Sequence, residues 1–323
     1  MKIFISGGAG FIGSHFAHSL ISDGSENQVV VYDNFSSGSL AHLDGISDSE
    51  RLKIIEGDIK NLDLLTSSMS GADLVVHFAA NPDIAKAVTQ PDIDFWEGTY
   101  LTQNILEAMR VNGVNDILYT SGSGVYGDDP KVAFEESYGP LFPISTYGAS
   151  KLACEALISS YCHMFGMRGR GFRFANVVGP KQTHGVGYDF IRRLNANPSM
   201  LRILGDGTQS KSYIHVYDVL NAIRLVYKDM RKEGSLVFDV FNVATDDYIS
   251  VTDIAVIACE VASISVNSVE FKYTGGDRGW KGDVPKVRFN VEKIKKLGWR
   301  SERTSMQAVW DSIESMKNEL IGI

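Results

Sequence analysis

Cysteine is scarce in this chain of 323 residues, and its placement excludes two kinds of site. The three cysteines, Cys154, Cys162 and Cys259, are odd in number and widely spaced, with no CxxC pair. Such a pattern makes neither a disulfide framework nor a cysteine-ligated metal site. The seven histidines are scattered, without an HExxH motif or a carboxylate cluster. We therefore expect no bound metal, and we interpret Cys154 and Cys162 as small buried hydrophobic residues.

Long apolar runs and an excess of basic charge are also lacking. No stretch reaches the ~20 apolar residues of a membrane span, and the apolar start at 2–6 is too short for a signal peptide. The 31 Lys+Arg against 39 Asp+Glu give a net charge of −8, which argues against a sequence-independent nucleic-acid binder. The sequence thus predicts a cytoplasmic globular protein with no membrane or nucleic-acid partner.

The first half of the chain alternates short β-branched runs with amphipathic stretches. Strands linked by helix-length connections pair in parallel through right-handed crossovers, so we expect an α/β fold with a Rossmann-type, doubly wound parallel sheet. The expected strands are 2–6, 28–32, 53–56, 74–77, 116–120 and 171–174. The expected helices are 11–22, 62–69, 92–112 and 145–165.

After about residue 175 the elements become shorter and glycines more frequent. Helical patterns cover 186–196, 216–231, 251–261, 291–297 and 305–319, and 237–243 again resembles a buried strand. We predict a first domain at 1–175, to which segments near 216–245 return. The rest of 176–323 is predicted to form a smaller, interleaved α/β substrate-binding lobe.

The 31 glycines are most informative at the end of the first predicted strand. There, Gly7, Gly10 and Gly13 form a GxxGxxG pattern that opens a predicted helix. The first glycine permits a tight turn, the second lets the backbone approach a pyrophosphate, and the third allows close packing of helix on strand. The N–H groups at the start of the helix, around Phe11 and Ile12, then face the phosphates. The context predicts a dinucleotide site rather than an ordinary turn.

An acidic residue at the end of the second strand selects among dinucleotides. The carboxylate of Asp33 would accept hydrogen bonds from ribose hydroxyls but repel a 2′-phosphate, so NAD is favoured over NADP. Asn34 would not bind such a phosphate, and no arginine follows closely. Asp58, after the third strand, is placed to meet the adenine edge, or it caps the next helix.

A second motif is Tyr147-Gly148-Ala149-Ser150-Lys151. Residues four apart share a helix face, so the lysine ammonium lies beside the phenol. A nearby cation favours the phenolate, which makes the tyrosine a general base. Of the 13 tyrosines, only Tyr147 has a lysine four residues later. A surface Tyr–Lys pair is the alternative.

These motifs, with Val125-Tyr126-Gly127 and matching stretches through 299, give the chain a resemblance to a known family. It resembles the NAD-dependent sugar-nucleotide epimerase/dehydratase family of extended short-chain dehydrogenases/reductases, typified by UDP-glucose 4-epimerase. The resemblance implies an NAD-binding Rossmann domain and a lobe that binds a nucleotide-diphosphate sugar of the UDP-linked kind. It also implies a homodimer built on a four-helix bundle, to which 92–112 and 145–165 contribute.

The resemblance assigns site residues by position. The cofactor would be bound by Gly7, Gly10, Phe11, Ile12, Gly13, Asp33, Asn34, Ser37, Gly38, Asp58, Ile59, Phe78, Ala79, Ala80, Tyr147 and Lys151. The substrate would be bound by Asn176, Lys211, Tyr213 and Arg278. Lys211 stands where the family usually has an arginine, so it keeps the charge but not the bidentate fork. For Lys211 and Arg278 the alternative is an ordinary surface charge.

Two positions depart from the family pattern. Gly122 stands where a Ser or Thr usually binds the reacting sugar hydroxyl, so Ser121 or Ser123 would have to replace it. Of the two we expect Ser121, because some members with glycine there keep a serine just before it. Phe95 stands in place of a usual Asn, so a polar contact that supports the catalytic lysine or its water network is expected to be lost.

The family pattern also favours one reaction. Family dehydratases carry an additional acid just before the VYG motif, whereas this chain has Ser123 and Gly124 there. We therefore expect epimerisation at C4: Tyr147 and Lys151 would assist hydride transfer to NAD, rotation of a 4-keto sugar and return of the hydride. The alternatives are a 4-ketoreductase or dehydratase of the same family, or a catalytically weak NAD-binding scaffold.

Overall fold

The structure is a computed structural model that describes the backbone of residues 1–321. The last two residues of the predicted lobe lie outside the described part. The chain forms two compact units. The first comprises Met1–Val125, Thr146–Arg173 and Ile223–Phe241. The second comprises Tyr126–Ser145, Phe174–Ala222 and the chain from Asn242 onward.

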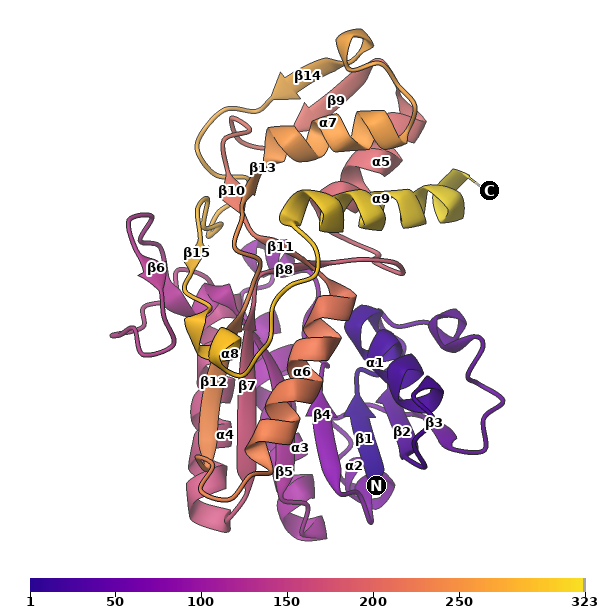
Figure 1. Ribbon diagram of the computed structural model, residues 1–323, viewed down its shortest axis with the longest axis vertical. Helices are drawn as coiled ribbons and strands as arrows, with labels where there is room; N and C mark the ends of the chain where they lie inside the picture. The colour runs from indigo at the N-terminus through magenta and orange to yellow at the C-terminus, as the bar shows by residue number, and fades with distance from the viewer. Residues whose placement is uncertain (322–323) are drawn as a thin grey trace. The chain divides into compact units, whose positions relative to one another are not determined.

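A seven-stranded sheet, built mainly by the first unit, confirms the predicted doubly wound fold (Figure 1). Its order is β12-β7-β5-β4-β1-β2-β3, and every pairing from β3 through β2, β1 and β4 to β5 is parallel. The strand order reverses between β1 and β4, and ligands of such sheets bind beyond the carboxyl ends of the strands at this switch point. The strands are β1 Lys2–Ser6, β2 Gln28–Asp33, β3 Leu52–Glu56, β4 Leu74–His77, β5 Asp116–Gly122, β7 Arg168–Phe174 and β12 Phe238–Val243.

Helices cover both faces of this sheet. Helix α1 (Phe11–Ser22) and the C-terminal half of α6 (Val216–Met230) lie on one face, and α2 (Leu62–Met69), α3 (Tyr100–Asn112) and α4 (Thr146–Phe165) on the other (Figure 1). The core beneath α2, α3 and α4 contains Phe4, Val75, Leu65, Ile105, Ile117, Cys154 and Ile158. The central strands are thus buried on both faces, which explains their runs of apolar residues without alternation.

The start of α3 differs from the expected continuous helix at 92–112. Residues Phe95–Thr99 form a π-helical turn, in which the Tyr100 N–H bonds to the Phe95 carbonyl five residues earlier. Such a wide turn adds a residue to the helix and rotates the preceding residues about the helix axis. π-Turns of this kind are frequent at functional sites.

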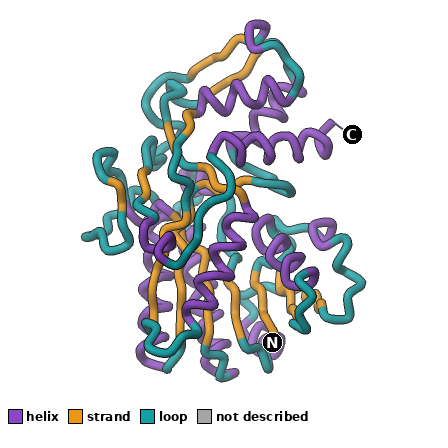
Figure 2. The backbone as a smooth tube through the Cα atoms, viewed as in Figure 1, coloured by secondary structure: helices purple, strands orange, loops and turns teal. Residues whose placement is uncertain are grey.

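The second unit combines short strand pairs with helices (Figure 2). Leu201, Phe190, Ile254, Ala258 and Ile313 belong to its core. The strand pairs are β8 (Asn176–Val178) with β11 (Tyr213–His215), β9 (Met200–Ile203) with β14 (Glu270–Tyr273), β10 (Ser210–Lys211) with β13 (Ile249–Ser250), and β15 (Arg288–Phe289) with β6 (Ala133–Phe134). Its helices include α5 (Val186–Ala196), α7 (Val251–Val261), α8 (Glu292–Lys296) and α9 (Ser305–Ile321).

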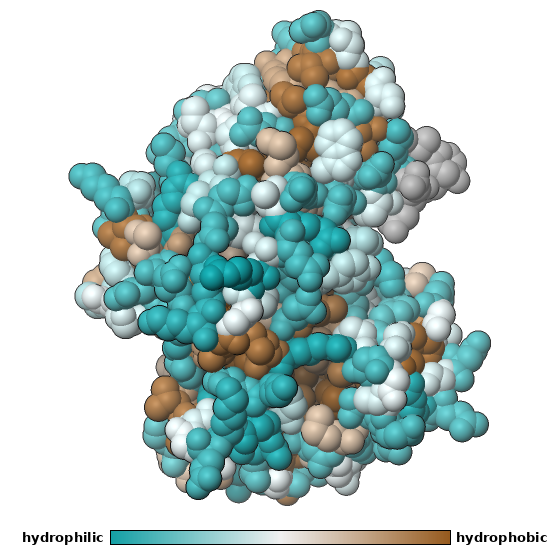
Figure 3. Space-filling model, in the orientation of Figure 1, coloured by the Kyte–Doolittle hydropathy of each residue, from teal (hydrophilic) through white to brown (hydrophobic). Residues whose placement is uncertain are grey.

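The surface carries no extended apolar belt on the face drawn in Figure 3, where hydrophobic residues form separate patches among hydrophilic ones. None of the helices within residues 1–321 combines the length and apolar character that crossing a membrane requires.

Candidate functional site

The glycine-rich turn between β1 and α1 is closed so tightly that side chains do not fit. A Cβ on Gly13 would lie 2.2 Å from the Gly7 carbonyl oxygen, and a Cβ on Gly7 would lie 2.6 Å from the Ala79 backbone nitrogen. Gly7 also has a φ of +69°, a conformation that favours glycine. The turn therefore brings the carboxyl ends of β1 and β4 together at the switch point.

Helix α1 begins at this turn without a side-chain cap. Its N-cap is Gly10, which forms no side-chain hydrogen bond, and no acidic residue lies in the first turn. The first amides of a helix have no acceptor within the helix, and the dipole favours an anion there. The N–H groups around Phe11, Ile12 and Gly13 therefore fit the diphosphate of a dinucleotide.

Asp33 is buried at the end of β2, against the glycine-rich turn. Its Oδ2 accepts a hydrogen bond from the Ala9 N–H at 2.9 Å, and its Oδ1 accepts one from the Phe35 N–H at 2.9 Å. Each carboxylate oxygen keeps further acceptor capacity. The backbone thus fixes the carboxylate in place, where it can receive ribose hydroxyls.

Asp58 does not cap a helix, so that alternative is wrong. The N-cap of α2 is Asn61, whose side chain accepts from the Leu64 N–H. The Asp58 carboxylate instead accepts from the Lys60 N–H at 2.8 Å and from Asn34 Nδ2 at 3.3 Å, so Asn34 and Asp58 lie together. The adenine contact stays a prediction. The side chain of Ile59 belongs to the core, and its carbonyl accepts a hydrogen bond from Asn104 Nδ2 at 3.1 Å.

The loop after β2 also approaches the glycine-rich turn. A Cβ on Gly38 would lie 2.9 Å from the Ala9 carbonyl carbon, and the Ser39 N–H bonds to the Ala9 oxygen at 3.1 Å. Ser37 directly precedes this close contact. On the opposite side of the turn, Phe78, Ala79 and Ala80 follow β4. The predicted cofactor residues outside α4 thus come from segments gathered around one turn.

The predicted catalytic pair lies on α4 against the end of β5. Lys151 is buried; its Nζ donates to the Thr120 carbonyl at 2.7 Å and lies 5.5 Å from the centre of the Tyr147 ring. The Thr120 carbonyl is a contact that the motif did not reveal. Burial raises the pKa of neighbouring Tyr119 well above its ordinary value, so that residue stays a phenol. Tyr147 is half-buried and is the other tyrosine whose ring lies beside Lys151.

His77 supports this region as a neutral side chain. Burial, followed by the nearby Lys151 charge, lowers the pKa of His77 to about 3. Its Nδ1 lies 2.7 Å from Ser6 Oγ and its Nε2 lies 3.1 Å from Thr102 Oγ1. The ring thus links the ends of β1 and β4 to α3, a role that no sequence motif indicated.

Gly122 faces the phenol of Tyr147, with room for a side chain. A Cβ on Gly122 would lie 4.0 Å from the Tyr147 hydroxyl oxygen, which is ordinary contact distance. A Ser or Thr side chain at this position would therefore lie beside the Tyr147 phenol.

Ser121, the expected substitute, is engaged elsewhere. Its hydroxyl donates to Glu155 Oε1 at 2.5 Å, and Arg173 Nη2 bonds to Glu155 Oε2 at 2.7 Å. All three side chains are buried. The single donor of the Ser121 hydroxyl is therefore engaged by Glu155, which disfavours the expected Ser121 as a hydrogen-bond donor to a sugar oxygen. Ser123 is half-buried and has no hydrogen-bond partner for its hydroxyl among the described residues, which makes it the better candidate.

Serine substitutions should separate these two roles. Ser123→Ala is expected to lower kcat by about tenfold, because it removes a hydrogen bond to the reacting oxygen. Ser121→Ala should leave kcat nearly unchanged but lower the free energy of unfolding by about 1–3 kcal/mol, because Glu155 loses a buried donor. Steady-state kinetics and denaturant unfolding measure both effects. Gly122→Ser, which fits the available space, should raise the kcat of Ser123→Ala; the reverse pattern would return the role to Ser121.

Phe95 does not point into the site. Its side chain is 51% exposed and packs edge-to-face against Trp96. A polar residue at 95 would therefore face solvent here, and no contact to Lys151 is lost through this position.

The four predicted substrate residues come together within the second unit. Asn176 and Tyr213 are register partners of β8 and β11. Lys211 Nζ pairs with Asp283 Oδ1 at 2.6 Å, and Arg278 Nη2 pairs with Asp128 Oδ2 at 2.5 Å. Arg278 Nη1 also donates to the Asp283 carbonyl at 2.5 Å. The two cations are thus neighbours that share one acidic residue, which the sequence did not indicate.

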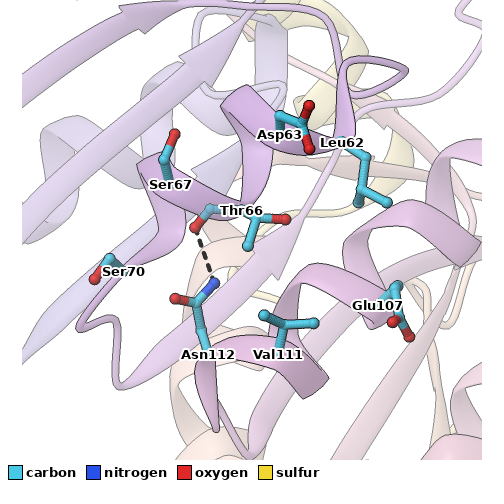
Figure 4. A pocket seen from close by; sticks show the side chains of 8 residues that line it. All are labelled: Leu62, Asp63, Thr66, Ser67, Ser70, Glu107, Val111 and Asn112. Atoms are coloured by element: carbon cyan, nitrogen blue, oxygen red, sulfur yellow. Dashed lines mark hydrogen bonds between the residues drawn. The ribbon is translucent and has the colours of Figure 1, made fainter.

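A separate hollow of about 480 Å³ lies between α2 and α3, and Asn112 Nδ2 donates to the Thr66 carbonyl at its wall (Figure 4). None of its eight lining residues is a predicted site residue. Within the described part of the chain, no three His, Cys, Asp or Glu side chains gather as metal ligands would.

The glycine-rich turn at the switch point, the acid after β2 and the Tyr–Lys pair define a Rossmann-type dinucleotide-binding protein. A sequence model of the NAD dependent epimerase/dehydratase family matches residues 3–244. The chain belongs to this family, and its cofactor is NAD. The close turn, the uncapped helix and the fixed Asp33 carboxylate fit that cofactor.

Individual relatives extend along nearly the whole chain. A putative UDP-glucose 4-epimerase of Methanocaldococcus jannaschii is 29% identical over 98% of both chains. A crystal structure of UDP-galactose 4-epimerase is similar with a TM-score of 0.86 and 37% identity, covering 99% of this chain and 100% of that one. A double mutant of dTDP-glucose 4,6-dehydratase from Streptomyces venezuelae, solved with NAD, has a TM-score of 0.87 at 25% identity, covering 98% and 97%.

Proposed function

We propose that the protein is an NAD-dependent C4 epimerase of a nucleotide-diphosphate sugar of the UDP-glucose/UDP-galactose type. The observation that carries the proposal is the Tyr147–Lys151 pair at the end of β5, with Ser123 and Gly124 where a dehydratase would carry an acid. Relatives named UDP-glucose 4-epimerase support it.

Bound NAD supplies an acceptor and donor of hydride at C4. Tyr147 takes the proton of the C4 hydroxyl as that carbon is oxidised, and it returns the proton when the carbon is reduced on its other face. The Lys151 ammonium, anchored by the Thr120 carbonyl, stabilises the phenolate that exists before Tyr147 takes the proton and again after it returns it. Ser123 donates a hydrogen bond to the same sugar oxygen. One residue thus serves as base and then as acid, so no second acid is needed.

In this proposal Lys211 and Arg278 bind the substrate diphosphate. Each cation already has an acidic partner, Asp283 or Asp128, which holds it in place before the substrate arrives. Asn176 and Tyr213 bind the nucleotide or sugar beside them. The chain also forms the family's homodimer through α3, the π-turn before it and α4, where exposed Trp96 of the turn and Met164 of α4 would be covered.

Truncating either cation should weaken substrate binding more than catalysis. Arg278→Ala and Lys211→Ala are each expected to raise KM by about 10–100-fold, because a charge-assisted hydrogen bond to phosphate is lost, with kcat changed less. Lys232→Ala, which removes an exposed cation paired with Asp229, should leave KM unchanged. Initial rates against substrate concentration decide the matter. A fall in kcat at constant KM would contradict the binding role.

The proposed function is tested with the purified full chain. It is incubated with UDP-glucose, UDP-galactose, their N-acetyl forms and UDP-glucuronate, without added cofactor, and the products are separated by chromatography. Interconversion at C4 is expected for at least one pair. A dehydrated product would indicate a dehydratase. In a parallel assay with a 4-keto sugar and added NADH, steady consumption of NADH would indicate a ketoreductase. If NAD binds but both wild type and Tyr147→Phe are inert, the protein is a scaffold.

A further inference from the structure

Asp94, which no motif singled out, lies buried immediately before the π-turn at the start of α3. Its side chain is 2% exposed. Oδ1 accepts a hydrogen bond from Asn81 Nδ2 at 2.9 Å, and Oδ2 accepts one from Thr146 Oγ1 at 2.7 Å. One carboxylate therefore joins the segment after β4 to the first residue of α4.

The backbone of Asp94 holds the same helix a turn later. The Asp94 carbonyl accepts from Ser150 Oγ at 2.7 Å, and Ser150 Oγ lies 3.0 Å from Thr99 Oγ1. Gly98 is close to the same hydroxyl, since a Cβ there would lie 2.4 Å from Ser150 Oγ. These bonds reach α4 on both sides of Tyr147, at positions 146 and 150.

The other partner of Asp94 belongs to the cofactor side. Asn81 directly follows Phe78, Ala79 and Ala80, and the Ala79 backbone lies against Gly7 of the glycine-rich turn. Asn81 is buried and also bonds both backbone groups of Asp83, so its amide is fixed in orientation. If the segment 78–81 moves, the Asp94 side chain, which is bonded to both Asn81 and Thr146, connects that movement to the start of α4.

We propose that Asp94 is a positioning residue, which holds Tyr147 in register with the cofactor-contacting segment 78–80. This inference rests on the proposed function, because it assigns Tyr147 the proton transfer. The π-turn leaves Phe95 exposed, and the buried polar residue at this point of the chain is Asp94. Small misplacements of a reacting group lower kcat far more than they lower binding.

The test uses Thr146, because its side chain can be altered with little change in volume. Thr146→Val removes the donor to Asp94 and is expected to lower kcat by about tenfold, with KM and NAD retention within twofold. Thr146→Ser keeps the hydroxyl and should restore kcat to within about threefold. Thr89→Val, which removes an exposed hydroxyl bonded to the Lys86 carbonyl, is the matched control. Wild-type kcat in Thr146→Val would overturn the proposal.

A cycle with Asp94→Ala adds a second criterion. Ala accepts neither bond, so Thr146→Val removes no further contact to residue 94, and its effect should not add to that of Asp94→Ala. Additive losses would overturn the proposed connection. Hydrogen exchange gives a readout without any reaction: Thr146→Val and Asn81→Ala should both speed exchange of the amides near 147–150. If the wild type turns over no sugar, the proposed function fails alone, and unchanged exchange in Asn81→Ala separately refutes the role of Asp94.

Discussion

Tyr147→Phe should lower kcat for C4 epimerisation by about 10³-fold, within the range of general acid–base catalysis. The substitution removes the one oxygen that takes and returns the proton. The ring remains, 5.5 Å from Lys151 Nζ, so the shape of the site and NAD retention should change little. Single-turnover and steady-state rates with the natural sugar pair measure the loss.

The matched control is Tyr161→Phe on the same helix. The Tyr161 hydroxyl accepts a hydrogen bond from Gln103 Nε2 at 2.6 Å and lies more than three turns from Tyr147 along α4. Its loss should leave kcat within about twofold, because one ordinary hydrogen bond far from the site affects stability rather than the reaction. Full activity in Tyr147→Phe would mean that another group moves the proton.

Gly13→Ala should abolish retention of NAD during purification, with an affinity loss of at least about 100-fold. The added Cβ would lie 2.2 Å from the Gly7 oxygen and 2.8 Å from the Gly8 Cα, both backbone atoms that cannot rotate away. The start of α1 must therefore move out from β1, and the amides that face the phosphates move with it. Equilibrium titration with NAD measures the loss.

Gly187→Ala is the matched control, which tests whether replacing a glycine near the start of any helix lowers the affinity for NAD. Gly187 is the second residue of α5, and its added Cβ would meet only the side chain of Ile313, at 3.1 Å. A flexible side chain can shift by a few tenths of an ångström, so NAD affinity should stay at the wild-type value. Wild-type affinity in Gly13→Ala would show that the turn does not bind the cofactor.

The sequence was most informative at positions where the local backbone conformation alone decides which residue can be accommodated. Gly7 and Gly13 are needed because the nearby backbone leaves no room for a Cβ atom, and a Cβ on Gly10 would lie 3.2 Å from the Gly7 oxygen, which is tighter than ordinary contact; such a requirement is local. The proximity of Tyr147 and Lys151 could be predicted for a similar reason, because residues four apart lie on the same face of a helix. The strands and helices of the sheet could be predicted for the same reason, since their periodicity lies within each segment.

Contacts between distant segments could not be predicted. Ser121 bonds to Glu155, which is 34 residues later, and spacing alone does not say which way the hydroxyl points. Asn61, rather than Asp58, caps α2 because the chain turns once more before the helix begins. The Asp94 contacts to Asn81 and Thr146 depend on a π-turn that rotates the helix, and a helical pattern does not reveal it.

The most direct test of the central claim traces an isotope at C4. The enzyme is incubated with UDP-galactose deuterated at C4. An equal amount of a second UDP-galactose is added, which has ordinary hydrogen at C4 and a carbon-13 label elsewhere in the sugar. If the hydride returns to the molecule that it left, UDP-glucose should keep deuterium at C4, with no crossover between the two populations and no exchange with solvent. Deuterium that is lost to solvent, appears at another carbon or crosses to the second population would contradict the account.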